Sequence, residues 1–404
     1  MHDLSAALQH SYQEHPAFRF NAPHWELRED ALAAFNATYA ATRQIGATLS
    51  DKSLAVLRRD CQRLMANVFS ALKVQCADET EIHFLAELAN ECERLLNEEL
   101  DWYARPTMAG LAHLDEDTGR QAAIHMQVER HFFGRLRPEA VDAMRDLASA
   151  DIARFRTNAA AGQLKRDDLS VSGGATVRAI RAILNREFRA LGVLDAVSAY
   201  TGRKTQVLGL ALELSVPQAT WWRNAIDGLD RPARTLYAHM DETISCPKAI
   251  VYLTDVNEQN GPTSCYPGAY EAMHLNPLQE MVGRVIGAVG TRPDSPLKQH
   301  YAKQYHQSMN SENFRRHFMR LPPVLRFNSH LGWDVMPGSD AEAQLVNAER
   351  KLTGLAGTFI AFDGARLLHR GGLMESGERV ALQVIFSDVT LTERIVSKAK
   401  RIFS

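Results

Sequence analysis

The sequence predicts an α+β protein, with a largely helical first part followed by a strand-rich second part. Two observations predict this division. Before about residue 200, apolar residues recur at the three- and four-residue spacing of amphipathic helices. After it, short apolar or alternating runs are bounded by Gly, Pro, Asn or Asp, as is typical of β-strands. We therefore expect a mostly helical portion over residues 1–200 and a β core over residues 201–404.

The helical portion contains several segments with a buried apolar stripe. The clearest is 82–100, in which Leu85, Leu88 and Cys92 follow one another at helical spacing. Further helices are expected over 49–72, 138–161 and 176–191.

The second part contains four strand-like runs, at 207–216, 248–256, 357–362 and 379–386. A partly helical insert interrupts them at about 271–356. Long insertions beside a β core often form lids or substrate walls, so we expect that role here. An amphipathic helix over 392–403 is expected to close the chain.

Composition limits the classes of function. The chain has 404 residues and a formal net charge of -2, so it lacks the strongly basic charge that is typical of nucleic-acid-binding proteins. No apolar run reaches membrane-spanning length, and the first residues lack the pattern of a signal peptide. Five cysteines are scattered without C-x-x-C spacing, which suits free thiols. We expect a cytoplasmic protein with a small-molecule substrate and neither nucleic-acid nor membrane partners; the oligomeric state stays open.

Two H-x-D pairs could provide metal ligands, because residues i and i+2 of an extended segment point to the same side. His239 and Asp241 lie just before a predicted strand, whereas His113 and Asp115 lie in the acidic stretch AHLDED. A pair of this kind is a weak signal by itself and could be a surface pair at a strand start. We expect the second pair to form a solvated turn or a helix start.

The stretches that follow His239 resemble the phytanoyl-CoA dioxygenase-like family of Fe(II)- and 2-oxoglutarate-dependent oxygenases. The matching stretches are HMD at 239–241, YLTDVNEQNGP at 252–262, PG at 267–268, HRGG at 369–372 and GER at 377–379. The resemblance covers the second half of the chain well and the first half poorly. It implies a double-stranded β-helix, a jelly-roll or cupin-like barrel, flanked by helices. It also implies Fe(II), with 2-oxoglutarate and O2 as cosubstrates.

The chain departs from the family pattern at three places. PGAY replaces the frequent PGSH, and Gly371 stands where a serine is common. A lysine often present before the H-x-D is missing, with Ser215 and Val216 near its place.

The physical argument for the metal ligands agrees with the resemblance. Non-haem Fe(II) oxygenases use two histidines and one carboxylate. If His239 and Asp241 supply two ligands, the third must come from a distant strand. His369 is the best candidate, since it follows the predicted strand 357–362 and precedes a glycine pair that permits close backbone approach.

Arg379 opens the strand 379–386, whose other residues are mostly apolar. A single arginine there needs a partner, and the far carboxylate of 2-oxoglutarate would suit its guanidinium fork. The alternative is an ion pair with Glu378 or Asp363. Further cosubstrate contacts are expected from Gln206, Thr254, Thr263 and Gln383.

We therefore expect an enzyme that hydroxylates a C–H bond of a small molecule and releases succinate and CO2. Desaturation or cyclisation at the same site is one alternative. A non-catalytic, metal-binding cupin-like module is another. Halogenation is disfavoured because Asp241 fills the position that a halide would need. A nucleic-acid demethylase is disfavoured by the near-neutral charge.

Overall fold

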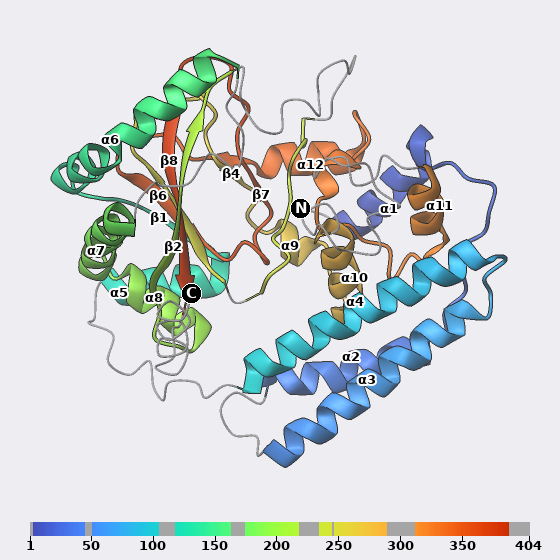
Figure 1. Cartoon of the computed structure of the whole chain (residues 1–404). Helices are drawn as coiled ribbons and strands as arrows, with labels where there is room; N and C mark the ends of the chain where they lie inside the picture. The colour runs from blue at the N-terminus through green and yellow to red at the C-terminus, as the bar shows by residue number, and fades with distance from the viewer. Residues whose placement is uncertain are drawn as a thin grey trace. The chain divides into compact units, whose positions relative to one another are not determined.

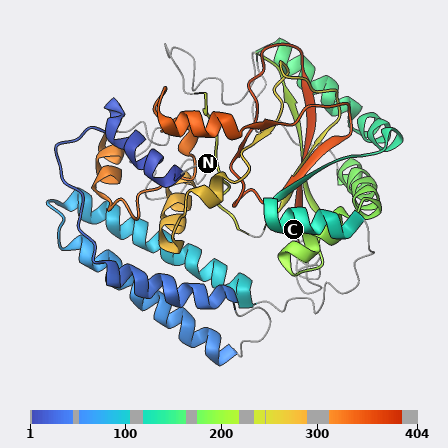
Figure 2. The ribbon, with the colours of Figure 1, turned by 180° about the vertical axis from the view of Figure 1, so that it is seen from behind.

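The computed structural model describes residues 3–44, 51–104, 118–162, 174–217, 234–244, 246–288 and 312–387 (Figures 1 and 2). The chain forms two compact units. Unit 1 comprises residues 1–107, 225–242 and 268–349, and unit 2 comprises residues 108–224, 243–267 and 350–404. The described elements of unit 1 are all helical, whereas all described strands belong to unit 2. The predicted portions 1–200 and 201–404 stay a prediction.

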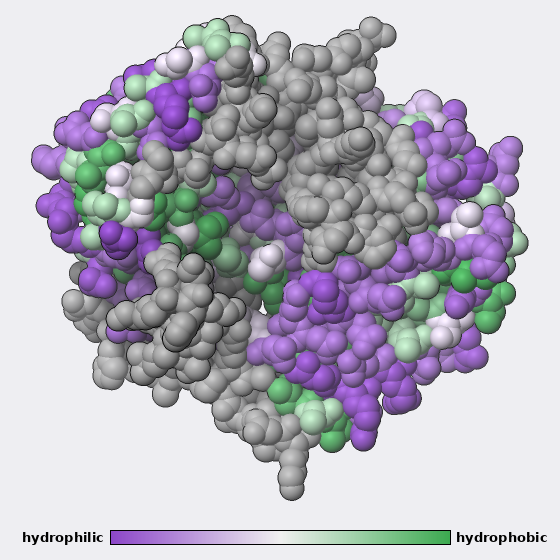
Figure 3. Space-filling model, in the orientation of Figure 1, coloured by the Kyte–Doolittle hydropathy of each residue, from purple (hydrophilic) through white to green (hydrophobic). Residues whose placement is uncertain are grey.

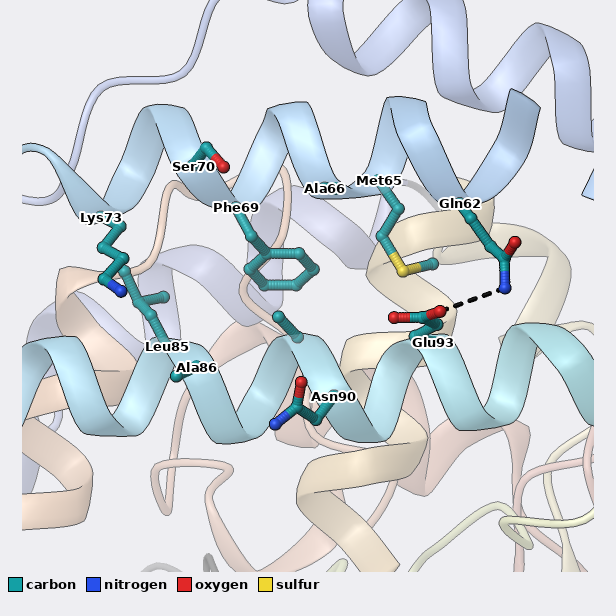
Figure 4. Close-up of a pocket in the computed structure, with 11 residues that line it drawn as sticks. Gln62, Met65, Ala66, Phe69, Ser70, Lys73, Leu85, Ala86, Asn90 and Glu93 are labelled. Atoms are coloured by element: carbon teal, nitrogen blue, oxygen red, sulfur yellow. Dashed lines mark hydrogen bonds between the residues drawn. The ribbon is translucent and has the colours of Figure 1, made fainter. Parts of the chain in front are cut away.

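Three long helices dominate unit 1: α2 (Glu29–Gln44), α3 (Asp51–Lys73) and α4 (Glu79–Ala104). Figures 1 and 2 show α3 and α4 side by side. Side chains of the two helices line a pocket, where Gln62 of α3 donates to Glu93 of α4 over 3.1 Å (Figure 4). The stripe predicted on α4 is buried, with Leu85, Leu88 and Cys92 in the core of this unit. The helices predicted over 49–72 and 82–100 are thus confirmed. Hydrophilic residues predominate on the outward face of α3 and α4, with apolar residues scattered among them (Figure 3).

Shorter helices complete unit 1. Two come from the N-terminus, α1 (Leu4–Glu14) and the 3-10 turn η1 (Pro16–Phe18). The others come from the predicted insert, which is indeed partly helical. These are α9 (Ala269–Ala272), α10 (Pro277–Ala288), α11 (Glu312–Arg320), η8 (Leu331–Trp333) and α12 (Asp340–Ala348). Apolar residues of α10 and α11 share the core of α3 and α4, so the insert packs on the N-terminal helices. Its role as a lid stays a prediction.

Unit 2 is built on a five-stranded antiparallel sheet with the order β1-β6-β3-β8-β2. The strands are β1 (His131–Arg135), β2 (Gln206–Ser215), β3 (Lys248–Tyr252), β6 (Thr358–Phe362) and β8 (Arg379–Ser387). All four predicted strand-like runs are confirmed, with β3 ending earlier than expected. β1 comes from the part of the chain that we expected to be mostly helical, and pairs with β6 at the sheet edge.

The two faces of this sheet differ as the alternation along β8 predicts. Val380, Leu382, Val384 and Phe386 pack in one core with α5 (Thr118–Glu129), α6 (Pro138–Ala160), α7 (Gly174–Ala190) and α8 (Val193–Thr201). Figure 1 shows these helices beside the sheet. Ala381 faces the other way, in a core that includes Cys265 and Leu367.

A second, three-stranded antiparallel sheet has the order β5-β4-β7. Its strands are β4 (Ser264–Cys265), β5 (Arg350–Lys351) and β7 (His369–Arg370). The fold therefore combines helices with antiparallel sheet, as predicted. That the two sheets close into a jelly-roll barrel stays a prediction.

Two expectations fall outside the described residues: the alternative pair His113 and Asp115, and the closing helix over 392–403. Within the described residues, no helix has both the length and the apolar character needed to cross a membrane.

Candidate metal centre

The H-x-D pair lies in unit 1, directly after a turn at residues 234–237. His239 is buried, and its Nδ1 lies 2.9 Å from the carbonyl oxygen of Tyr237. A carbonyl can only accept, so Nδ1 carries the hydrogen and Nε2 offers its lone pair. That Nε2 lies 3.8 Å from Oδ1 of Asp241. The two side chains therefore present a nitrogen and a carboxylate oxygen close together, as a shared metal ion requires.

His369 lies in unit 2 on β7, where it pairs with Cys265 of β4. Its side chain is buried, and Nδ1 lies 2.8 Å from the carbonyl oxygen of Leu367. Both candidate histidines thus bond through Nδ1 to a carbonyl two residues earlier, an arrangement that fixes the ring and directs Nε2 to a metal. The expected close backbone approach occurs at Gly372, where an added Cβ would lie 2.2 Å from the carbonyl oxygen of Pro262.

Among the described residues, His239, Asp241 and His369 form one group. Each offers one ligand atom, and these atoms lie within 4.8 Å of one another. Two imidazole nitrogens and one carboxylate oxygen are the donor set of the non-haem Fe(II) oxygenases. The tautomers assigned above fit the same ion, because a metal binds only the unprotonated nitrogen. This group is therefore a candidate iron site.

Arg379 is buried at the start of β8. It donates to the carbonyl oxygen of Gly261 and, over 3.1 Å, to Oγ of Ser215. Among the described residues, no carboxylate lies within ion-pair distance of its guanidinium group.

The two acids considered as its partners are engaged elsewhere. Glu378 accepts from Arg156 over 2.5 and 3.0 Å. Asp363 accepts from Tyr200 over 2.5 Å and from Arg366 over 3.3 Å. The alternative reading of Arg379 as a member of an ion pair with Glu378 or Asp363 is therefore wrong.

Of the other expected cosubstrate contacts, Thr254 and Thr263 lie in loops near β8, and Gln383 lies on β8 itself. Thr254 Oγ1 accepts from the backbone N–H of Val380 over 3.0 Å, beside Arg379. Thr263 is buried and donates its backbone N–H to the hydroxyl of Tyr252 over 2.8 Å. Gln383 lies on β8 opposite Ile250 of β3, two pleats beyond Arg379 and on the same face. Their contact with a cosubstrate stays a prediction.

The expectation that Gln206 and Arg379 contact the same cosubstrate needs correction. Gln206 pairs with Ser387 at one end of β8, whereas Ser215 pairs with Arg379 at the other end. A strand rises about 3.4 Å per residue, so Gln206 and Arg379 are separated by roughly 27 Å along the sheet. One molecule of 2-oxoglutarate cannot reach both. The strand assignment around Gln206 is correct, but Gln206 and Arg379 cannot both be contacts of one cosubstrate molecule, and the proposal below keeps Arg379.

Sequence reasoning missed three residues around these sites. Ser215, noted only for the missing lysine, accepts from Arg379. Tyr252 donates to the carbonyl oxygen of Leu352 and accepts from Thr263; burial raises the pKa of its hydroxyl, which therefore stays neutral. His330 stacks on His239 with ring centroids 5.0 Å apart. An apolar strand with one tyrosine could have indicated Tyr252, whereas no local signal indicates His330.

No model of a protein family matches the chain, and no curated protein matches it. Some solved structures are similar to it. EctD from S. alaskensis, in a crystal with 2-oxoglutarate and 5-hydroxyectoine, shares 14% identity over 70% of this chain and 83% of its own, with a TM-score of 0.36.

AviO1 from Streptomyces viridochromogenes shares 14% identity over 68% of this chain and 96% of its own, with a TM-score of 0.34. SnoK, a non-heme alpha ketoglutarate dependent carbocyclase from nogalamycin biosynthesis, shares 13% identity over 68% of this chain and 85% of its own, with a TM-score of 0.33. TM-scores this low identify neither fold nor reaction, so the proposals below rest on the residues of this chain.

Proposed function

We propose that this protein is an Fe(II)- and 2-oxoglutarate-dependent dioxygenase that oxidises a C–H bond of a small molecule, most simply by hydroxylation. His239, Asp241 and His369 would hold the iron, and Arg379 would bind the far carboxylate of 2-oxoglutarate. When bound, iron with 2-oxoglutarate and O2 supplies the oxidant, with succinate and CO2 as co-products. The family resemblance of the motifs and the donor set of the three ligands support this proposal.

The burial of Arg379 carries the proposal furthest. A buried guanidinium group without an anion is costly, because two neutral oxygen partners do not replace its hydration. Gly261 and Ser215 supply such neutral oxygens, and among the described residues Nε of Arg379 has no hydrogen-bond partner. A dicarboxylic acid would bring the missing anion in the geometry that a guanidinium fork prefers. A metal-binding module without a cosubstrate has no use for this cation.

The groups around the ligands and around Arg379 have distinct roles in this proposal. The Tyr237 and Leu367 carbonyl oxygens hold His239 and His369 in the tautomer that offers Nε2. Asp241 contributes the carboxylate, which favours oxygenation over halogenation because a halide would need its place. Ser215 and Gly261 orient the guanidinium group of Arg379 toward the cosubstrate. Thr254, Thr263 and Gln383 are proposed as further contacts.

A non-catalytic metal-binding module is the second candidate, since the ligand group by itself would also suit storage or sensing. Desaturation and cyclisation would use the same residues and differ in the substrate. Consumption of 2-oxoglutarate separates the module from the enzymes, and product analysis separates the enzymes from one another.

Metal and cosubstrate binding test the proposal directly. Purified wild-type protein should bind one Fe(II) per chain, and anaerobic 2-oxoglutarate should then give a weak visible charge-transfer band. His239→Ala, Asp241→Ala and His369→Ala should each lose the band, whereas the control His113→Ala should retain it. A band retained by all three ligand variants would refute the assigned ligands, and loss in His113→Ala would favour the other H-x-D pair.

A further inference from the structure

Residues 327–332 of unit 1, here called the brace segment, lie against the stretch that contains His239. The backbone N–H of Met240 donates to the carbonyl oxygen of Ser329 over 2.8 Å. The N–H of Gly332 donates to the carbonyl oxygen of Ala238 over 2.9 Å. The brace segment is therefore hydrogen-bonded to the residues immediately before and after His239. It comes from the insert, about 90 residues further along the chain.

The approach at Gly332 is too close for any other residue. An added Cβ there would lie 2.1 Å from the carbonyl oxygen of Thr235 and 2.5 Å from the backbone nitrogen of Ala238. The Thr235 hydroxyl also donates to the carbonyl oxygen of Gly332 over 3.1 Å. The brace segment and the turn before His239 thus form one tightly packed backbone unit.

The side chain of His330 contacts His239 directly. Their rings stack with centroids 5.0 Å apart and an angle of 15° between the planes. The ring of Tyr237 also lies against His239, with centroids 4.6 Å apart. His330 is itself fixed, since its N–H donates to Asn328 Oδ1 over 3.0 Å and Nδ1 lies 3.2 Å from Ser329 Oγ. His239 therefore lies against a neighbour whose own position is set by separate hydrogen bonds.

Helix α10 packs against the brace segment at two glycines, Gly283 and Gly287. An added Cβ on Gly287 would lie 1.9 Å from Ser329 Oγ and 2.5 Å from His330 Nδ1. An added Cβ on Gly283 would lie 2.1 Å from the ring of Phe327. Residues four apart share one face of a helix, so the two glycines make a flat surface that receives the brace segment. A glycine in a helix interior, as at Gly283, costs about 1 kcal/mol relative to alanine, so its presence here is consistent with a need for close packing.

Helix α10 is in turn fixed to the N-terminal helices. Arg284, between the two glycines, forms a buried ion pair with Glu99 of α4. Leu278, Met281 and Val282 share the core of α3 and α4. A continuous set of contacts therefore runs from α4 through α10 and the brace segment to His239.

We propose that His330 is a positioning residue for His239, and that α10 and the N-terminal helices hold it in place through the glycine surface. The inference rests on the proposed function only in taking His239 as a metal ligand. It assigns the helical N-terminal part of unit 1 a task, namely to fix the orientation of that ligand.

Titration with Co(II), followed by its visible absorption, tests the inference without any substrate. Gly287→Ala should weaken Co(II) binding about 10- to 100-fold, the loss typical when a group that orients a ligand is disturbed. His330→Ala should weaken it similarly. His330→Phe, which keeps a flat ring against His239, should bind within about threefold of wild type. Gly174→Ala at the start of α7 is the matched control, because its Cβ would meet only the end of the Arg178 side chain at 3.3 Å.

The outcomes separate the two claims. Wild-type protein that binds no Co(II) would refute the proposed function, and this inference with it. Wild-type binding that Gly287→Ala and His330→Ala leave unchanged would refute the inference alone. Melting temperatures should show that each variant is folded at the temperature of the titration. If Gly287→Ala does not fold, the two His330 variants decide: equal affinity of His330→Ala and His330→Phe contradicts the inference.

Discussion

Arg379 Nη2 donates a hydrogen bond over 3.1 Å to Oγ of Ser215, where the first residue of β8 lies opposite the last residue of β2. The arginine is thereby fixed at one end of the sheet without an acidic partner among the described residues. The predictions on cosubstrate binding follow from this relationship.

Loss of the Arg379 guanidinium group should act on 2-oxoglutarate and spare the metal. Hydrogen bonds to charged groups contribute about 1.5–3 kcal/mol, so Arg379→Ala should raise the KM for 2-oxoglutarate about 10- to 150-fold. Arg379→Lys keeps the charge without the fork and should fall between wild type and Arg379→Ala. Both variants should keep Fe(II) affinity within about threefold.

Cosubstrate preference provides the control for this experiment. Wild-type protein should use a 2-oxo acid without the distal carboxylate poorly, and Arg379→Ala should discriminate less between the two acids. Arg156→Ala, which removes the partly exposed ion pair to Glu378, should leave the preference unchanged. An unaltered preference in Arg379→Ala, with a lower melting temperature alone, would assign Arg379 a structural role.

Substitution of Ser215 should also raise the KM for 2-oxoglutarate, but less than substitution of Arg379. Ser215→Ala removes one neutral acceptor from Arg379 and leaves the guanidinium group in place, so the KM for 2-oxoglutarate should rise about 3- to 10-fold, corresponding to about 1 kcal/mol. Ser215→Thr retains a hydroxyl and should stay closer to wild type. A KM that neither substitution changes would show that the Ser215 hydroxyl does not help to orient Arg379.

Many of the elements and the candidate metal ligands could be predicted from local sequence patterns. The helical spacing on α4 and the alternation on β8 predict both elements, because each follows from one-sided burial within the element itself. His239 and His369 could be proposed from H-x-D, the glycine pair and their order along the chain. Among the described residues, the ligand atoms of His239, Asp241 and His369 lie within 4.8 Å of one another.

The features that local patterns miss depend on contacts between distant segments. β1 is five residues long and becomes a strand through pairing with β6, more than 200 residues away. The position of Gln206 depends on strand register, which its own sequence does not set. His330 contacts His239 only because two loops share backbone hydrogen bonds. Gly283 and Gly287, four residues apart in α10, hint at close packing on that helix, although they do not indicate His330 itself.

The buried ion pair that anchors α10 should be important for stability. Glu99→Ala would leave Arg284 buried without this partner, and losing one member of a buried pair costs about 3–5 kcal/mol. The neighbouring Glu98→Ala removes an exposed pair with Arg94 and should cost at most about 1 kcal/mol. Urea unfolding measures both values. Equal losses in the two variants would contradict a structural role for the buried pair.

Asp334 should make stability depend on pH. Burial raises the pKa of its carboxyl from 3.8 to about 7. Between these two values the folded protein holds a proton that the unfolded chain has released. The contribution of Asp334 to the free energy of unfolding is therefore largest below about pH 4, falls as the pH rises toward 7, and is level above it.

Substitution by asparagine isolates this effect. Asp334→Asn keeps an acceptor for the Asn328 amide, which donates to Asp334 over 2.5 Å, and removes the titration. The variant should be more stable than wild type at pH 8 and show a smaller fall in melting temperature between pH 5 and pH 8. The surface substitution Asp146→Asn should leave the wild-type profile unchanged. A profile equally steep in Asp334→Asn would show that another group causes it.

Turnover of 2-oxoglutarate tests the central claim most directly. Wild-type protein with Fe(II) and O2 should convert 2-oxoglutarate to succinate and CO2, slowly without substrate and faster with a small molecule that is oxidised in the same assay. Asp241→Ala and Arg379→Ala, both checked for folding, should form little succinate at the same 2-oxoglutarate concentration. Wild-type protein that binds Fe(II) but forms no succinate with any of a broad set of small molecules would contradict the account and favour a metal-binding module.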